Sequence, residues 1–209
     1  MVASLETKTL TAQEYLEREV LSDTRNEFHA GEIVSMTGGT PRHNRISGNL
    51  YILLSLELKK LVYEVFHLDQ RLWIPEREFY TYPDVMVTAK PLVFQSGRKD
   101  TLENACFIAE VLSKSTRSYD LGDKFTAYRT IETLQEYVLI DQYRVNVEHR
   151  VRNSENQWLV SYYDRLDTTF QLKSFDVEIA IADLYENVEL DTADASERGE
   201  FAPNQGELE

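Results

Sequence analysis

The sequence predicts a mixed α/β fold, and three observations lead to that prediction. Short apolar runs rich in β-branched side chains, at residues 79–89, 105–112 and 136–140, are typical of buried strands. Two stretches, 43–61 and 120–131, repeat apolar side chains at helical spacing. Alternating segments bounded by turn residues flank these elements and predict β-hairpins.

The first third of the chain is expected to begin with a short helix and a hairpin. Thr11 and Glu14 have the spacing of a capping box, which predicts a helix through about Leu21. Residues 25–36 alternate around Gly31 and predict a hairpin. The long helix over 43–61 follows a Gly-rich loop.

Two strands are predicted after the long helix, over 64–74 and 79–89. Pro83 lacks an N–H donor and has a fixed φ, so the second strand should start or bulge there. Asp84 would then lie at the mouth of a strand. Residues 90–104 are polar and predict a surface loop.

The remaining elements complete an α+β order of helix, three strands, helix and strand, with flanking hairpins and short terminal helices. In sequence they are the third strand at 105–112, a helix at 120–131, a strand at 136–140, a hairpin at 145–151 and 158–163, a strand pair around 170–175 and a helix near 181–184.

The length of the chain predicts one well-buried core, so we expect a single domain over residues 1–190. Residues 191–209 are acidic, with Gly and Pro, and are predicted to be a disordered tail. No apolar run or signal-peptide pattern predicts contact with a membrane. The single cysteine, Cys106, lies in a predicted buried strand, which fits a reducing cytoplasm.

The net charge of −14 argues against tight, non-specific binding of nucleic acid, because phosphates attract clustered Lys and Arg. The two ends of the chain carry most of this charge. Residues 186–209 hold eight acidic and one basic side chains, and residues 1–40 hold seven and three. The middle of the chain is therefore close to neutral, and a nuclease is not excluded.

Two of the apolar runs each carry one carboxylate, at Asp84 and Glu110. A buried ionised carboxylate is costly unless a cation or hydrogen-bond donors neutralise it. Two of them on neighbouring strands, followed by a lysine on a helix, suggest a divalent cation and an activated water.

Four motifs also occur in order along the chain. They are Tyr82-Pro83-Asp84-Val85, Glu110-Val111-Leu112-Ser113 with Ser115-Thr116, Asp120 with Lys124 and Tyr128, and Glu136-Tyr137-Val138-Leu139-Ile140-Asp141. This ordered set resembles the Uma-type restriction endonuclease family of bacteria, within the PD-(D/E)XK nuclease superfamily. The similarity covers roughly residues 8–190.

The resemblance implies a restriction-endonuclease-like core and metal-dependent hydrolysis of DNA phosphodiester bonds. Asp84, Glu110 and the backbone carbonyl of Val111 would bind Mg²⁺ or Mn²⁺, for which oxygen atoms are suitable ligands. Glu27, and with less support His43, would complete the site as a metal-shell or water-positioning group. No organic cofactor is implied.

The sequence departs from the superfamily pattern at the lysine. The pattern places Lys two residues after the strand acid, where this chain has Leu112. Lys124 on the following helix is the candidate replacement, since it lies four residues from both Asp120 and Tyr128 and hence on their face. Lys124 could instead form only a salt bridge with Asp120 or belong to a solvated helix face.

The other candidate residues also have structural interpretations. Glu27 could be a solvated strand residue. A lone histidine such as His43 is more often a helix cap or a packing residue than a ligand. Asp120 could cap its helix. Arg98 and Lys99 in the surface loop are indistinguishable from a generic surface.

Three functions remain open from the sequence. The first is a metal-dependent DNA endonuclease. The second is a catalytically silent binding or regulatory protein that keeps the fold, which the acidic surface and the missing in-strand lysine favour. In the third, Asp84 and Glu110 are structural, satisfied by backbone donors, in a protein that self-associates. A homodimer is expected, with the hairpin at 143–163 as a possible contact.

Overall fold

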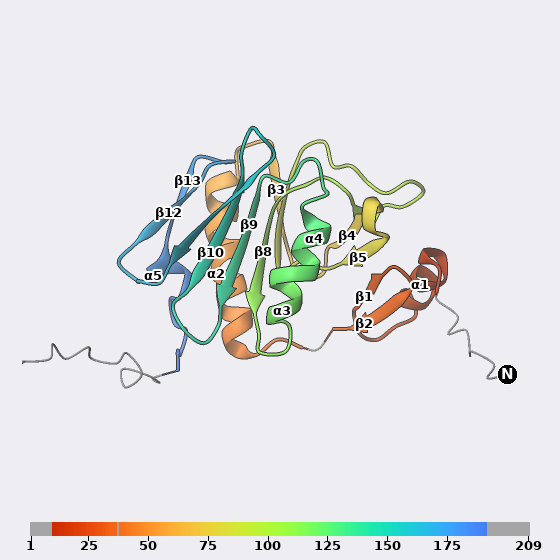
Figure 1. Ribbon diagram of the computed structural model, residues 1–209, viewed down its shortest axis with the longest axis horizontal. Coiled ribbons are helices and arrows are strands. Elements are labelled where there is room, and N and C mark those ends of the chain that lie inside the picture. The colour runs from red at the N-terminus through yellow and green to blue at the C-terminus, as the bar shows by residue number, and fades with distance from the viewer. Residues whose placement is uncertain (1–9, 37, 192–209) are drawn as a thin grey trace, which may run out of the picture.

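The computed structural model describes residues 10–36 and 38–191, which form a mixed α+β fold around three sheets (Figure 1). A six-stranded sheet lies at the centre, a five-stranded sheet lies beside it, and a two-stranded hairpin packs over one face. The α+β class predicted from the sequence is confirmed. Of the tail predicted over 191–209, residues 192–209 lie outside the described residues.

The central sheet has the strand order β11-β10-β9-β8-β6-β3. Its strands are β3 (Tyr63–His67), β6 (Val85–Ala89), β8 (Ala105–Leu112), β9 (Glu136–Asp141), β10 (Val147–Arg152) and β11 (Trp158–Tyr163). Only β8 and β9 are parallel neighbours within this sheet, and a helical crossover joins them. Their carboxyl ends therefore lie at the same edge of the sheet.

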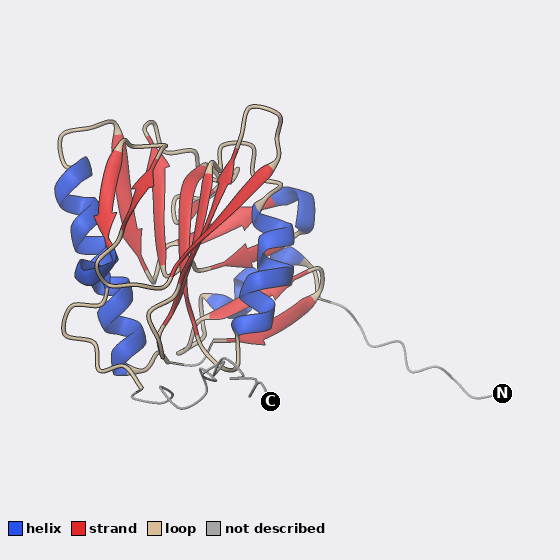
Figure 2. Cartoon of the chain, turned by 60° about the vertical axis from the view of Figure 1, so that its left-hand side comes forward, coloured by secondary structure: helices blue, strands red, loops and turns tan. Residues whose placement is uncertain are grey.

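Helices cover both faces of the central sheet (Figure 2). One face packs against α2 (Pro41–Leu58), α5 (Ile181–Leu184) and the hairpin of β12 (Thr169–Leu172) and β13 (Val177–Ala180). The helical segment between β8 and β9 packs against the other face. Burial on both sides explains why β8 reads as a continuous apolar run in the sequence.

The crossover segment changes its helical geometry along its length. It comprises α3 (Arg117–Tyr119), one π-helical turn, η2 (Asp120–Lys124), and α4 (Phe125–Tyr128). It begins three residues earlier than the helix expected over 120–131. Single π-helical turns such as η2 occur frequently at functional sites.

The second sheet has the order β2-β1-β5-β4-β7 and carries the N-terminal helix. Its elements are α1 (Ala12–Glu19), β1 (Asn26–His29), β2 (Glu32–Ser35), β4 (Arg71–Ile74), β5 (Phe79–Thr81) and β7 (Thr101–Leu102), with the short helix η1 (Pro75–Arg77) joining β4 to β5. The predicted capping box of Thr11 and Glu14 is present on α1. The loop expected over 90–104 contains β7.

Two segments that the sequence predicts as single strands are each divided between the two sheets. The expected strand over 64–74 breaks into β3 and β4 near Leu68, which has a positive φ of 59°. The expected strand over 79–89 breaks into β5 and β6 around Pro83, which cannot donate a ladder hydrogen bond. Asp84 therefore lies at the junction of the sheets, directly before β6.

Candidate active site

Asp84 and Glu110 converge at one edge of the central sheet. Val85 pairs with Ala109 across β6 and β8, which places the two acidic residues beside each other. The backbone N–H of Asp84 donates to Glu110 Oε2 at 3.4 Å. Both residues are buried, so two carboxylates share one low-dielectric region.

Asp84 is oriented by two donors on the same oxygen. The backbone N–H of Val111 donates to Asp84 Oδ2 at 2.7 Å, and His43 Nε2 lies 3.1 Å from that oxygen. Burial lowers the pKa of His43, but its hydrogen bond to Asp84 and the charge of that carboxylate outweigh burial and raise the pKa above its ordinary value. The family resemblance implies a role for the backbone carbonyl of Val111, whereas its contact with Asp84 uses the amide N–H.

Lys124 lies in the middle of three carboxylates. Its Nζ is 3.0 Å from Glu27 Oε1, 3.1 Å from Glu110 Oε1 and 3.4 Å from Asp120 Oδ1. The lysine is 5% exposed, so it is neither on a solvated helix face nor paired with Asp120 alone. Burial lowers the pKa of Lys124, but the charges of Glu110 and Glu27 raise it well above its ordinary value.

Glu27 reaches this cluster through the pairing of β1 with β5. Phe28 lies opposite Tyr80 in the ladder, which brings Glu27 near Thr81. Thr81 Oγ1 donates to Glu27 Oε1 at 2.5 Å, and the glutamate is buried. The alternative of a solvated strand residue is therefore wrong for Glu27.

Asp120 lies inside the helical segment and does not cap it. The segment starts at Arg117, and the Asp120 carboxylate is buried against Lys124. Burial raises the pKa of Asp120, and the charge of Lys124 opposes that rise. A capping role for Asp120 is therefore excluded by its position.

Two hydroxyl groups that sequence reasoning gave no role complete the cluster. The hydroxyl of Tyr128 donates to Glu110 Oε1 at 2.6 Å and lies 3.3 Å from Thr81 Oγ1. Tyr128 could have been found, because it lies four residues after Lys124 on the same helix face. Thr81 could not, because its contact with Glu27 spans 54 residues of sequence.

The environment of Glu110 favours a protonated carboxyl group when no other cation is present. Burial raises the pKa of Glu110 to about 8, the charge of Lys124 opposes the rise, and the charge of Asp84 adds to it. An added positive charge next to Asp84 and Glu110 would relieve this cost.

The donor set fits a hard divalent cation. Mg²⁺ keeps several waters and is commonly bound through one or two carboxylates, so Asp84 and Glu110 are the residues that could hold such an ion. Within residues 10–36 and 38–191, no group of three or more His, Cys, Asp or Glu side chains is arranged so that it could hold a metal ion.

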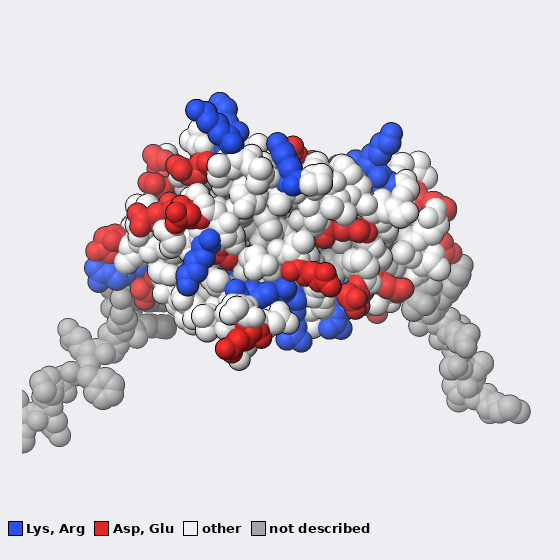
Figure 3. Space-filling view, turned by 90° about the horizontal axis from the view of Figure 1, so that it is seen from above, with Lys and Arg blue, Asp and Glu red and all other residues white. Residues whose placement is uncertain are grey.

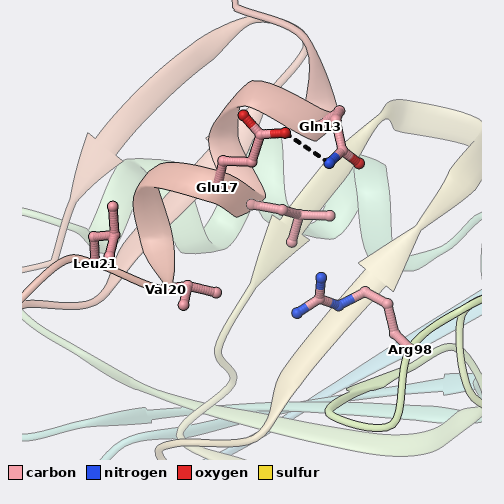
Figure 4. Close-up of a pocket in the computed structure, with 6 residues that line it drawn as sticks. Gln13, Glu17, Val20, Leu21 and Arg98 are labelled. Atoms are coloured by element: carbon pink, nitrogen blue, oxygen red, sulfur yellow. Dashed lines mark hydrogen bonds between the residues drawn. The ribbon is translucent and has the colours of Figure 1, made fainter.

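A pocket elsewhere in the molecule is separate from this cluster (Figure 4). It has a volume of about 430 Å³ and lies beside α1, where the close-up shows Arg98 opposite the helix. Its lining residues are Gln13, Leu16, Glu17, Val20, Leu21 and Arg98. The acidic cluster and this pocket have no residue in common.

The sheet order and the helices on both faces define a restriction-endonuclease-like fold. A crystal structure described as a "putative nuclease belonging to DUF820", from Anabaena variabilis, superposes with a TM-score of 0.70 at 18% sequence identity, covering 84% of this chain and 97% of that chain. At this identity the likeness is one of fold.

The chain belongs to the Uma2 family, described as "Putative restriction endonuclease", whose model matches residues 12–182. Two relatives from Synechocystis sp. are similar over most of their length. Protein sll1609 is 46% identical over 161 residues, covering 77% of this chain and 91% of the relative, and protein slr1290 is 33% identical over 178 residues, covering 84% and 91%. The family resemblance read from the sequence is thus confirmed, and family and fold together support a nuclease-like function.

The described part of the chain contains no helix that is both long and apolar enough to cross a membrane.

Proposed function

We propose that the protein is a metal-dependent endonuclease that hydrolyses DNA phosphodiester bonds. The observation that carries this proposal is the convergence of buried Asp84 and Glu110 with the amine of Lys124, 3.1 Å from Glu110. A purely structural ion pair needs one acid for one base. Here three carboxyl groups surround one lysine and a fourth, Asp84, lies beside Glu110. This crowding of acids raises the pKa of Glu110, so a further cation in place of the proton on Glu110 is favoured.

Asp84 and Glu110, helped by the carbonyl of Val111, would hold Mg²⁺ or Mn²⁺. A cation bound there would polarise the phosphate, lower the pKa of a water and stabilise the departing oxygen. Tyr128 and Lys124 both contact Glu110 Oε1, which orients the other oxygen, Oε2, toward Asp84. Thr81 donates to Glu27, and Glu27 in turn holds the lysine.

Lys124 would stabilise the negative charge that develops on the phosphate or on the attacking water. A positioned cation in a site with little water is worth far more than one in bulk solvent. Asp120 is proposed to keep the ammonium group in place, and His43 to keep the orientation of Asp84. In this arrangement Lys124 replaces the absent in-strand lysine.

The decisive experiment is incubation of supercoiled plasmid with the purified protein and Mg²⁺ or Mn²⁺. The wild type should nick or linearise the plasmid, and Asp84→Asn should reduce cleavage to background. Glu32→Gln is a matched control, because Glu32 is an exposed acid on the hairpin that carries Glu27. In parallel, calorimetry should detect Mn²⁺ binding by the wild type and none by Glu110→Ala.

A catalytically silent binding protein that self-associates is the second candidate. Two observations favour it: Leu112 stands where the superfamily has its lysine, and the net charge is −14. The absence of metal-dependent cleavage on supercoiled, linear and single-stranded DNA would make this the better function.

A homodimer is proposed under either function. The edge strand β11 exposes Leu159, Val160 and Tyr162, and an apolar edge strand is a suitable surface for pairing with a second copy. Sedimentation velocity of the wild type against Val160→Lys tests this directly, because a charge on the edge should shift a dimer toward monomer.

A further inference from the structure

Basic side chains gather at the edge of the central sheet where β8 and β9 end. The two strands are parallel with Leu112 opposite Asp141, so the segments that follow them leave at the same edge. Lys114 follows β8, Arg117 begins the helical crossover, and Arg144 lies in the turn after β9. We call these three side chains the basic rim.

A buried acid at the end of β9 holds both arginines of the rim. Asp141 Oδ2 lies 2.6 Å from Arg117 Nη1 and 3.4 Å from Arg144 Nε, while the backbone N–H of Tyr143 donates to Oδ1 at 2.9 Å. The Asp141 side chain is 4% exposed, whereas the side chains of Arg117 and Arg144 are 38% and 68% exposed. Since a guanidinium group has five N–H donors, most of the donors of the pair remain available at the surface.

The third rim residue adds a further positive charge without a carboxylate beside it among the described residues. Lys114 is exposed, and its ammonium group lies 5.1 Å over the ring of Tyr143. Arg42, near the start of α2, is not part of the rim, because Asp191 already pairs with it at 2.6 Å. The rim thus has three cations, two of which share one buried carboxylate.

The rim is unusual in a chain of this composition. The net charge is −14, and the opposite end of the molecule, seen from above in Figure 3, shows acidic and basic side chains interspersed. Glu110 lies only two residues before the end of β8, so the rim begins next to the candidate active site. A local cation cluster beside a phosphodiester-cleaving site suits a polyanionic backbone.

We propose that the basic rim binds backbone phosphates of DNA that flank the bond to be cut, with Asp141 as the residue that positions Arg117 and Arg144. The inference rests on the proposed function and extends it by naming the surface that binds the substrate. Phosphate contacts of this kind fix the register of a duplex and contribute no sequence preference.

The test measures binding of a short fluorescent duplex DNA by full-length protein in an Asp84→Asn background, with and without Mg²⁺, over a range of salt concentrations. The rim variant is Lys114→Ala/Arg144→Ala, which leaves Arg117 on Asp141 so that the buried acid keeps its partner. The matched control is Lys59→Ala/Lys60→Ala, which removes two exposed charges at the far end of α2.

The rim variant should bind more weakly and lose about two units of the slope of log K against log salt, since each phosphate contact contributes ~0.9. The control should keep the slope of the parent. An equal loss in both variants, an unchanged slope in the rim variant, or no salt-dependent binding by the parent would overturn the inference.

Plasmid cleavage by the wild type separates this inference from the proposed function. Cleavage together with an unchanged slope in the rim variant would refute the rim alone. Rim-dependent binding without cleavage under any metal would refute the nuclease and leave the rim as a DNA-binding surface.

Discussion

At the scale of single residues, the carboxyl group of Glu110 accepts hydrogen bonds from three groups of the site. One of its oxygens accepts from Tyr128 and Lys124, and the other accepts from the backbone of Asp84. Two of these donors come from the crossover segment, and the third comes from the junction directly before β6. The orientation of this carboxylate therefore depends on the crossover helix as much as on the strand that carries it.

Tyr128→Phe should weaken metal binding while the fold survives. The hydroxyl donates to Glu110 at 2.6 Å, and its loss should cost about 0.5–1.5 kcal/mol of stability, the usual range for one hydrogen bond. We expect Mn²⁺ affinity measured by calorimetry to fall several-fold, with a small shift in the thermal midpoint. Tyr162→Phe, an exposed tyrosine on β11, is the control, and identical behaviour of the two variants would contradict a positioning role.

Lys124→Met should be strongly destabilising in the absence of metal. The substitution keeps the volume of the side chain and leaves Glu27, Glu110 and Asp120 buried without their shared cation. Removing one partner of a buried pair costs about 3–5 kcal/mol, which urea denaturation at neutral pH can measure. Lys60→Met, at an exposed position, should leave the free energy of unfolding almost unchanged. If Lys124→Met lowers the free energy of unfolding no more than Lys60→Met does, the side chains of the cluster are only weakly coupled.

The pH dependence follows from the raised pKa of Glu110. Its pKa is about 8 in the folded protein, against an ordinary 4.5, so the folded state binds a proton that the unfolded chain releases. The contribution of this group to stability is therefore full below pH 4.5 and is lost as pH rises through about 8.

Metal binding should show the opposite trend, because the proton must leave before the cation binds. We expect Mn²⁺ affinity to rise about tenfold per pH unit up to roughly pH 8 and then level off. Calorimetry in two buffers of different ionisation enthalpy should detect one proton released at pH 7. A flat affinity profile between pH 6 and 8 would contradict the raised pKa.

At the scale of elements, the site depends on a group of hydrogen bonds that joins α1 to the second sheet. Glu19 at the end of α1 accepts hydrogen bonds from the Tyr82 hydroxyl and from the backbone of Asn26, each at 3.0 Å. Arg71 Nε donates to the same Tyr82 hydroxyl at 2.8 Å. Since Tyr82 is two residues before Asp84, these hydrogen bonds fix the strand break that positions Asp84.

Glu19→Ala should therefore destabilise the protein by about 1–3 kcal/mol, the cost of leaving buried donors without an acceptor. Glu17→Ala is the control, because Glu17 lies on the same helix, is exposed and accepts only from Gln13 among the described residues. Chemical denaturation measures both variants. Equal stabilities would show that α1 is held by its apolar contacts alone.

Element boundaries also show where sequence reasoning succeeded. The strand over 105–112 and the helix near 181–184 match β8 and α5 residue for residue, because a buried run or a short amphipathic stretch is a local pattern. The strands over 64–74 and 79–89 were too long, because periodicity continues across a break when both halves are buried.

At the scale of the whole molecule, the net negative charge of the protein opposes the binding of DNA, the proposed substrate. The net charge is −14, and the acidic cluster lies beside the surface that would meet phosphate. The protein should therefore bind DNA weakly until a cation offsets the negative charge of this cluster.

Asp84→Asn should bind duplex DNA more tightly than the wild type in the presence of a chelator. Removing one negative charge next to a phosphate is worth about 1 kcal/mol, or roughly a fivefold change in affinity. Fluorescence anisotropy at low salt measures it, with the exposed Glu32→Gln as control. A wild type that binds as tightly as Asp84→Asn without metal would place the DNA away from this cluster.

The sequence by itself determined the α+β class, the family, and the placing of Glu110 on a strand, Asp84 at the mouth of the neighbouring strand and Lys124 on the next helix. Each of these depends on local periodicity or on an ordered motif. Only the tertiary structure decided that Glu27 meets Lys124 and Thr81, that His43 contacts Asp84, and that Lys114, Arg117 and Arg144 form a rim. These contacts join residues from separate elements, and strand register and helix crossover, which set the distances between side chains, are not encoded in any short stretch of sequence.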